Sequence, residues 1–184
     1  MAKEQPRLLK KYREEVIPEV QKRFGLKNAM AVPHLEKIVI NMGVGAAVVD
    51  IKNLEAAVQD LTTIAGQKPQ TCRSKKAISN FKLKENVPIG CKVTLRKAKM
   101  YEFMDRFLNF SLPRIRDFNG VPRKAFDKQG NYTLGLSEQV LFPEIDTGKM
   151  VRPQGMHITF VFNKGPQEQT FVVLQLLGMP FSKN

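Results

Sequence analysis

Ten lysine and arginine side chains lie between residues 68 and 99, together with a single acid, Glu85. These cations are Lys68, Arg73, Lys75, Lys76, Lys82, Lys84, Lys92, Arg96, Lys97 and Lys99. Elsewhere the charges are closer to balance: residues 1–67 carry ten basic and eight acidic side chains, and residues 136–184 carry four of each. A dense cluster of one sign predicts binding to a polyanion, with nucleic acid as the leading class and an anionic membrane surface as the second.

Uncharged polar side chains are interleaved with these cations. Ser74, Ser79, Asn80 and Thr94 can hydrogen-bond sugar and phosphate oxygens while the lysines supply charge. Phe81 could stack on an exposed base, although we expect it to anchor the loop in which it lies. RNA is favoured over DNA because the sequence has no helix-turn-helix, zinc-finger or basic-zipper pattern that would enter a major groove.

Residues that would support catalysis or metal binding are sparse. The stretch NMGVGAAV (41–48) has the position of a dinucleotide-binding turn, but Val48 stands where the fingerprint needs a small residue. Cys72 and Cys91 have no neighbours at metal-ligand spacing. A metal-dependent nuclease would need several carboxylates beside the bound phosphate, and the basic segment 68–99 contains only one, Glu85. We therefore predict no metal, no cofactor and no enzymatic activity, with an RNA-modifying or RNA-cleaving enzyme as the first rival.

The elements that must position this cluster follow from hydrophobic periodicity. Alternating residues predict half-buried strands, and apolar residues three and four positions apart predict helices. The expected strands are 35–43, 70–73, 91–96, 132–136 and 156–163. The expected helices are about 6–24, 51–65 and 100–112, with a last short helix between Pro166 and Gly178; residues 74–88 are expected to be a long basic loop. Asp50 is the expected cap of the second helix, and Gly66 is its expected end. The apolar sides expected to be buried are Leu9, Tyr12, Val16, Val20 and Phe24 in the first helix, Ile51, Leu54, Val58, Leu61 and Ala65 in the second, and Met100, Phe103, Met104, Phe107, Leu108 and Leu112 in the third.

These elements predict an α+β fold. The strands alternate apolar and polar residues, which suits a mostly antiparallel sheet with helices packed on one face and the other face open for RNA. Lys92, Thr94 and Arg96 are expected side by side on the open face. The 184 residues, 42% of them hydrophobic, suffice for one core, so we expect a single domain over residues 1–184.

Neither a signal peptide nor a membrane-spanning run is recognisable in the sequence. Two cysteines make a poor disulfide framework, which favours a reducing, cytoplasmic compartment. A protein that binds anionic membranes is the second rival, and it would need an amphipathic helix with a basic polar face. The first predicted helix comes nearest, but its polar face carries Glu14, Glu15 and Glu19.

Seven short motifs occur in the same order as in one protein family. They are VINMGVG (39–45), GQKP (66–69), KKAISNFKL (75–83), PIGCKVTLR (88–96), PRIRDFNG (113–120), GNYTLG (130–135) and FPEI (142–145). From about Tyr12 to the C-terminal MPF, the chain resembles the bacterial-type large-subunit ribosomal protein five family, the binders of 5S ribosomal RNA.

This resemblance implies a structural protein of the cytoplasmic ribosome whose sheet face and first glycine turn hold 5S rRNA in the central protuberance. It also implies a basic loop that reaches the elbow of the peptidyl-site tRNA. A surface around residues 137–152 would meet a small-subunit head protein across an intersubunit bridge. Other large-subunit rRNA and neighbouring 5S-associated ribosomal proteins complete the implied partners.

The expected contacts can be assigned to positions of this chain. Matching positions of the family assign 5S rRNA contact to Asn41, Met42, Gly43, Gln67 and Thr94, and the basic cluster adds Arg73, Lys92 and Arg96. The expected tRNA and phosphate contacts of the loop are Lys75, Lys76, Ser79, Lys82 and Lys84.

The chain departs from the family pattern at a few positions. Cys72 and Ala77 stand where the family more often has Thr and Ser, so a contact that needs a hydroxyl at position 77 is not expected. Lys75 and Lys76 keep the positive charge of the loop, and RKAKM (96–100) adds more before the helix.

Overall fold

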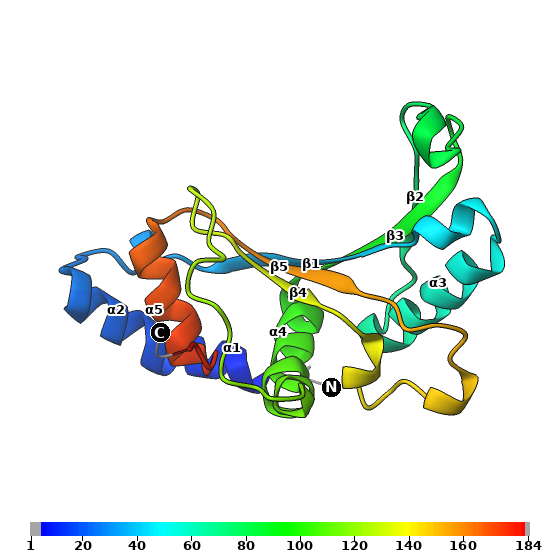
Figure 1. Cartoon of the computed structure of the whole chain (residues 1–184). Coiled ribbons are helices and arrows are strands. Elements are labelled where there is room, and N and C mark those ends of the chain that lie inside the picture. Colours follow the sequence, from blue (N-terminus) through cyan, green and yellow to red (C-terminus); the bar gives the residue numbers. More distant parts are fainter. Residues whose placement is uncertain (1–4, 183–184) are drawn as a thin grey trace. The chain divides into compact units, whose positions relative to one another are not determined.

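The computed structural model describes residues 5–182, without the side chain of Lys149. It is an α+β structure with a mostly antiparallel five-stranded sheet in the order β2-β3-β1-β5-β4 (Figure 1), as the sequence predicts. The strands are β1 (Leu35–Gly43), β2 (Gln70–Arg73), β3 (Pro88–Leu95), β4 (Tyr132–Leu136) and β5 (Met156–Phe162). The helices are α1 (Arg7–Lys11), α2 (Ile17–Phe24), α3 (Lys52–Ala65), α4 (Lys97–Arg106) and α5 (Gln167–Leu177).

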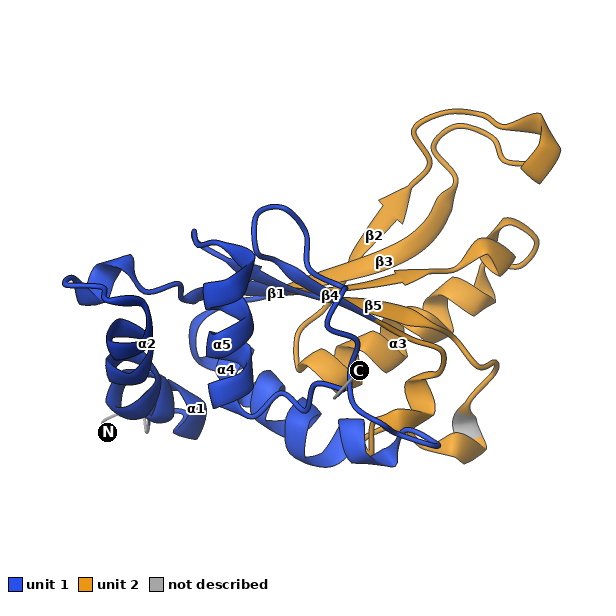
Figure 2. Ribbon diagram, turned by 60° about the vertical axis from the view of Figure 1, so that its left-hand side comes forward, with its two compact units in different colours: residues 1–38, 95–134, 159–184 blue, residues 39–94, 135–158 orange. Residues whose placement is uncertain are grey.

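The chain divides into two compact units (Figure 2). Unit 1 consists of residues 1–38, 95–134 and 159–184, and unit 2 consists of residues 39–94 and 135–158. Strands β1, β3, β4 and β5 each contribute residues to both units. The expectation of one domain over residues 1–184 stays a prediction.

Alternation along the strands gives the sheet one covered face. In β4, for example, Tyr132, Leu134 and Leu136 are buried while Thr133 and Gly135 are exposed. Within unit 1 the helices α1, α2, α4 and α5 lie on one side of the strands, and within unit 2 the same holds for α3 (Figure 2). The predicted open face is therefore present, because alternate side chains of a strand point to opposite sides.

The first predicted helix is a continuous helical segment with a wide turn in its middle. Residues Tyr12–Val16 form a π-helical turn between α1 and α2, ending two positions before Pro18. Such a wide turn accommodates a proline whose missing N–H breaks the regular α-helical ladder. Tyr12, Val16 and Val20 are buried as expected, but Leu8 is buried in place of Leu9.

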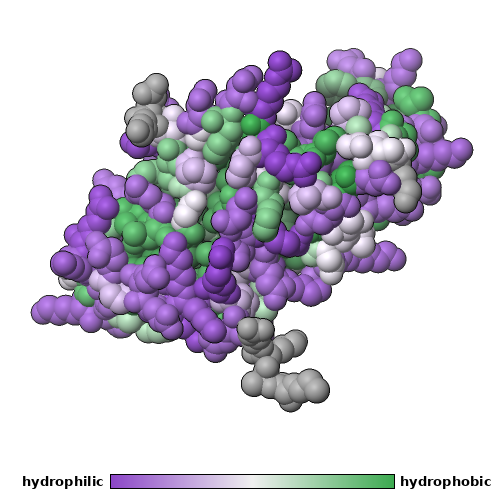
Figure 3. Space-filling model, turned by 90° about the horizontal axis from the view of Figure 1, so that it is seen from below, coloured by the Kyte–Doolittle hydropathy of each residue, from purple (hydrophilic) through white to green (hydrophobic). Residues whose placement is uncertain are grey.

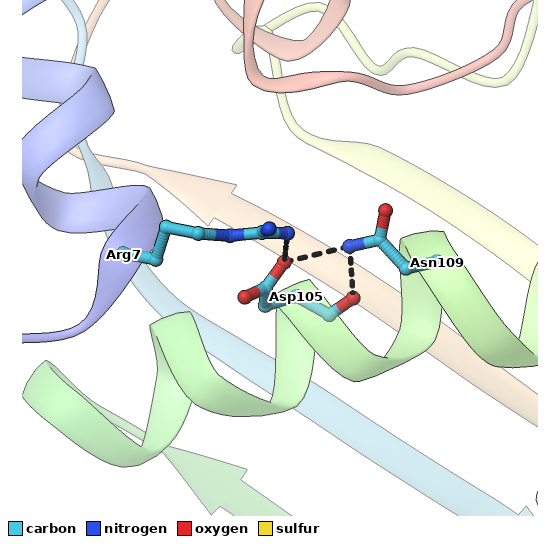
Figure 4. A network of polar contacts seen from close by, with 3 residues as sticks. All are labelled: Arg7, Asp105 and Asn109. Atoms are coloured by element: carbon cyan, nitrogen blue, oxygen red, sulfur yellow. Dashed lines mark hydrogen bonds and ion pairs between the residues drawn. The ribbon is translucent and has the colours of Figure 1, made fainter.

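A polar contact fixes this segment to α4 within unit 1 (Figure 4). One guanidinium nitrogen of Arg7 donates to Oδ1 of Asp105 at 2.6 Å, and Nδ2 of Asn109 donates to the same oxygen at 2.7 Å. The Arg7 side chain is 71% exposed, so this ion pair contributes only about 0–1 kcal/mol. The buried apolar side of the helix supplies most of the attachment.

That burial bears on the membrane-binding rival. The apolar side of the N-terminal helix packs inside unit 1, so it is not available to a bilayer. Seen from below the view of Figure 1, hydrophilic residues cover most of the visible surface, with smaller hydrophobic areas between them (Figure 3). Within residues 5–182, no helix combines the length and the apolar character needed to cross a membrane.

An aromatic core holds α4 and the strands of unit 1 together. Phe103 and Phe107 stack with centroids 5.9 Å apart, and Phe107 contacts Phe160 of β5 at 6.2 Å. The helical segment continues through a π-helical turn (Phe107–Ser111) and ends in a 3-10 turn at Leu112–Arg114, which contains Pro113. All six apolar residues predicted for this helix's inner side are buried: Met100, Phe103, Met104, Phe107, Leu108 and Leu112.

Helix α3 covers the strands of unit 2. Its inner side buries Leu54, Leu61 and Ala65 as predicted, and Gly66 ends it in the left-handed conformation at φ 60°. The carboxylate of Asp50 accepts from the main-chain N–H of Lys52 at 2.9 Å, but the N-cap residue is Ile51, one position later than expected, and it makes no side-chain cap hydrogen bond. The prediction for Ile51 was wrong: its side chain is 53% exposed because it precedes the first helical turn.

Candidate nucleic-acid interface

The open face of unit 2 gathers the polar residues that the sequence assigned to 5S rRNA. Asn41 and Gly43 of β1 are exposed on either side of the buried Met42, and Lys92 of β3 is exposed beside the buried Val93. Thr94 follows on β3 and is half-buried. Their placement on one side follows directly from the alternation of β1 and β3.

Gln67 joins this face from the loop after α3. The αL conformation of Gly66 turns the chain back, and Nε2 of Gln67 then donates to the main-chain oxygen of Thr94 at 3.4 Å. The structure therefore brings Gln67 next to Thr94, 27 positions later in the chain.

One of the predicted contact residues is buried, and another lies just beyond the end of its strand. The side chain of Met42 has no solvent exposure, so it belongs to the core and only its main chain could reach a partner. Arg96 is exposed, but it directly precedes α4 in unit 1 and lies beyond the end of β3. The expectation that it continues the strand was wrong, because β3 ends at Leu95.

The turn after β1 leaves open space at two glycines. A Cβ atom added at Gly43 or at Gly45 would have no heavy atom within 4 Å. Gly90 is different, because its Cβ would lie 2.7 Å from the main-chain oxygen of Met42. Gly90 is thus required by the close approach of β3 to β1, whereas Gly43 and Gly45 leave room for something outside the protein.

The segment predicted as a loop is the end of an ordered hairpin. Strands β2 and β3 are antiparallel, with Gln70 opposite Lys92 and Cys72 opposite Gly90. Beyond them, Oγ of Ser74 donates to the oxygen of Lys84 at 2.6 Å and accepts from the N–H of Val87 at 3.1 Å. Ser74 is 7% exposed, so the expectation that its hydroxyl meets RNA was wrong: the hydroxyl closes the hairpin.

The cations of the basic hairpin (residues 70–95) point to solvent. Nη1 of Arg73 donates to the main-chain oxygen of Asn86 at 3.1 Å, which fixes its stem across the hairpin. The five residues expected to contact tRNA or phosphate are all exposed: Lys75, Lys76, Ser79, Lys82 and Lys84. Phe81 is 73% exposed, so the expectation that it anchors the loop was wrong.

A buried side-chain amide, through a second glutamine, stabilises the glycine turn (residues 43–45). The side chain of Gln139 is 1% exposed. Its Nε2 donates to Oδ2 of Asp60 at 3.3 Å and to the main-chain oxygen of Arg152 at 2.8 Å. Its Oε1 accepts from the main-chain N–H of Gln154 at 2.5 Å. Nε2 of Gln154 in turn donates to the oxygen of Gly43 at 2.8 Å. Burial raises the pKa of Asp60, and the hydrogen bond from Gln139 partly opposes that rise.

Sequence reasoning missed Gln139 and Gln154, which lie in or beside the segment expected to form the bridge surface. Glutamine is usually exposed, and nothing in the local sequence marks these two. Val151, Arg152 and Pro153 of the same stretch are exposed and remain available to a partner.

Groups suited to metal or redox chemistry are not assembled near this face. Across residues 5–182, no three His, Cys, Asp or Glu side chains come together in a way that could hold a metal ion. Cys72 and Cys91 are free thiols. Burial, with smaller contributions from Cys72 and Asp60, raises the pKa of Cys91 to about 11.

Two family models match the chain, one after the other. Residues 28–84 match the model described as ribosomal protein L5, and residues 88–181 match the model for the C-terminus of the same ribosomal protein family. The chain is 56% identical to large ribosomal subunit protein uL5 of Clostridium tetani, over 96% of this chain and 98% of that protein. It is 55% identical to the proteins of the same name in Clostridium beijerinckii (96% and 99% covered) and Prosthecochloris aestuarii (96% and 90%).

Proposed function

This chain belongs to the ribosomal protein L5 family, and we propose that it binds 5S rRNA through the open face and the glycine turn of unit 2. As a member of this family it is a structural, non-enzymatic constituent of the large ribosomal subunit in the cytoplasmic ribosome. The observation that carries the 5S proposal is the exposure of Asn41, Gly43 and Lys92 on one side of two neighbouring strands.

Such a face suits RNA recognition by shape. Strands are rigid, so amide, hydroxyl and ammonium groups on them keep fixed spacings that match one arrangement of sugars and phosphates. Each hydrogen bond from Asn41 or Thr94 contributes about 1 kcal/mol net, which selects the register of binding. The lysines supply the larger, salt-dependent share of affinity by displacing counterions from the phosphates.

The glycine turn gives the RNA backbone a place to approach the main chain. Gly43 and Gly45 carry no side chain and have empty space where one would be. The 2.8 Å hydrogen bond from Gln154 holds the oxygen of Gly43 in place, so the surface presented to the RNA is fixed before binding.

The basic hairpin carries the second proposed contact. Lys75, Lys76, Lys82 and Lys84, with the hydroxyl of Ser79, would bind phosphates of the peptidyl-site tRNA. The hairpin is preformed by the bonds of Ser74, so binding does not have to order it. We also propose that exposed residues of 137–152 meet a small-subunit head protein at an intersubunit bridge, and that the protein lies in the central protuberance with other 5S-associated proteins.

A binding titration tests the 5S proposal. We would titrate the chain with 5S rRNA, with tRNA and a DNA duplex as competitors, at two salt concentrations. We expect selective 5S binding that persists at moderate salt and that Asn41→Ala combined with Thr94→Ala weakens by about 10- to 50-fold, from about 1 kcal/mol or slightly more per lost hydrogen bond. Equal binding to all three nucleic acids, insensitive to the double substitution, would leave only a basic surface.

Two glycine variants separate contact from folding. Gly43→Ala meets no atom of the protein, so it should fold with unchanged stability and still weaken 5S binding, because its methyl group occupies the space for the RNA backbone. Gly45→Ala is the matched variant in the same turn. Unchanged 5S affinity for both would remove the glycine turn from the proposed site.

A further inference from the structure

The tip of the basic hairpin exposes an apolar surface among its lysines. Phe81 is 73% and Ile78 is 44% exposed, and both lie between Lys76 and Lys84. Exposed apolar side chains that lie together, rather than singly, are the feature that marks a binding site, and the hairpin tip presents two of them three positions apart.

The main chain holds this tip in a defined conformation. Ile78 and Leu83 form a two-bond bridge, with N–H to oxygen distances of 2.8 and 3.1 Å. Inside it, the N–H of Phe81 donates to the oxygen of Ile78 at 3.2 Å. Lys82 adopts the left-handed conformation at φ 51°, which a non-glycine residue rarely does. The ring of Phe81 is therefore presented by a closed turn.

The surroundings of the ring decide the class of partner. Four lysines lie within a few positions of it in the chain, with Glu85 as the single acid of the hairpin loop. A flat apolar ring among cations is the combination that binds an unpaired or terminal nucleobase, because the ring stacks on the base while the ammonium groups bind the adjoining phosphates.

We propose that Phe81 stacks on an exposed base of the RNA that the hairpin binds, so that the hairpin recognises a base face as well as phosphates. This inference rests on the proposed tRNA contact of the same hairpin. It adds base stacking on Phe81 as the interaction that makes the hairpin selective for a folded RNA. Ile78 extends the apolar surface beside the ring.

Stacking and phosphate binding differ in their salt dependence. Counterion release makes the lysine contribution fall with salt, whereas stacking on Phe81 releases no ions. Phe81→Ala should weaken binding to folded tRNA by about 5- to 150-fold without changing the slope of log K against log salt. Lys82→Ala should instead lower the magnitude of that slope by about one.

The experiment measures these affinities by fluorescence titration with the full chain. The probes are a folded tRNA, a blunt RNA duplex of similar charge, and a short single-stranded RNA carrying 2-aminopurine, whose emission reports stacking. Phe81→Tyr keeps a flat ring and Phe81→Leu keeps apolar area without one. Val49→Ala, which truncates a 93% exposed side chain elsewhere in unit 2, is the matched control.

The expected result is loss of tRNA affinity and of 2-aminopurine quenching with Phe81→Ala, near-normal binding with Phe81→Tyr and Val49→Ala, and a partial defect with Phe81→Leu. If Phe81→Ala binds tRNA normally while Lys75→Ala with Lys76→Ala does not, the stacking proposal is overturned and the proposed tRNA contact stands. If the wild type does not prefer tRNA to the duplex, both are overturned.

Discussion

Replacing Gln139 with leucine should destabilise unit 2 although the two side chains have similar size. The Gln139 amide is 1% exposed and makes three hydrogen bonds, to Asp60, to the oxygen of Arg152 and from the N–H of Gln154. Each contributes about 1 kcal/mol net, and the leucine methyl groups offset less than one of them. We therefore expect the free energy of unfolding to fall by about 2–3 kcal/mol.

Urea denaturation followed by circular dichroism measures this loss, and thermal unfolding should show a midpoint lower by about 4–12 °C. Gln59→Leu is the matched control, since Gln59 lies on the exposed side of α3 and should change stability by less than about 0.5 kcal/mol. Gln139→Glu tests the contact with Asp60, because it places a second carboxyl group beside that residue. The loss of stability in this variant should grow as pH rises and both carboxyl groups ionise.

A Gln139→Leu protein as stable as Gln59→Leu would refute the view that this amide organises unit 2. A normal 5S affinity in a destabilised Gln139→Leu protein would refute only the link from Gln139 through Gln154 to Gly43. The two measurements therefore test separate steps.

Further predictions concern single groups in unit 2. Gly90→Ala should lower the free energy of unfolding by about 1–3 kcal/mol in urea, because its methyl group would lie 2.7 Å from the oxygen of Met42. Burial raises the pKa of Asp60, so this carboxyl group binds a proton more tightly in the folded protein than in the unfolded chain. The free energy of unfolding should therefore fall as pH rises from below the ordinary carboxyl range through the raised pKa. Asp60→Asn should flatten this part of a curve of stability against pH. At pH 8 the half-buried Cys72 should react with a thiol reagent well before the buried Cys91, whose pKa is about 11, and equal rates would contradict the packing of Cys91.

The strands and helices could be predicted because their signals are local. Ile38, Ile40 and Met42 alternate within a few positions, and the same alternation placed Asn41 on the opposite, open side. The same alternation contradicted the assignment of Met42 to 5S rRNA contact, because a side chain that faces the core cannot also reach RNA.

The hairpin could not be predicted in the same way. Its order depends on Ser74, whose hydroxyl bonds residues 10 and 13 positions away, and such contacts leave no periodic pattern. Phe81 was expected to be an anchor because most aromatic residues are buried, yet the closed turn at Ile78 and Leu83 already fixes the main chain without it.

The support of the glycine turn was equally hidden. Gln139 is buried by α3, which supplies Asp60 from 79 positions earlier in the chain. Long-range contacts of this kind decide which polar residues are buried, so they become visible only in the folded molecule.

The way the chain passes between the two units has a consequence for its synthesis. Unit 1 is assembled from three separate segments, the last of which begins at residue 159, and β5 lies between β1 and β4 in the sheet. Until residues 156–162 have left the ribosome that makes them, β1 has an unpaired edge, and such edges invite pairing with other chains. Contacts between distant segments also form slowly. A new copy of this protein therefore completes its sheet only once β5 has been translated, long after β1 itself.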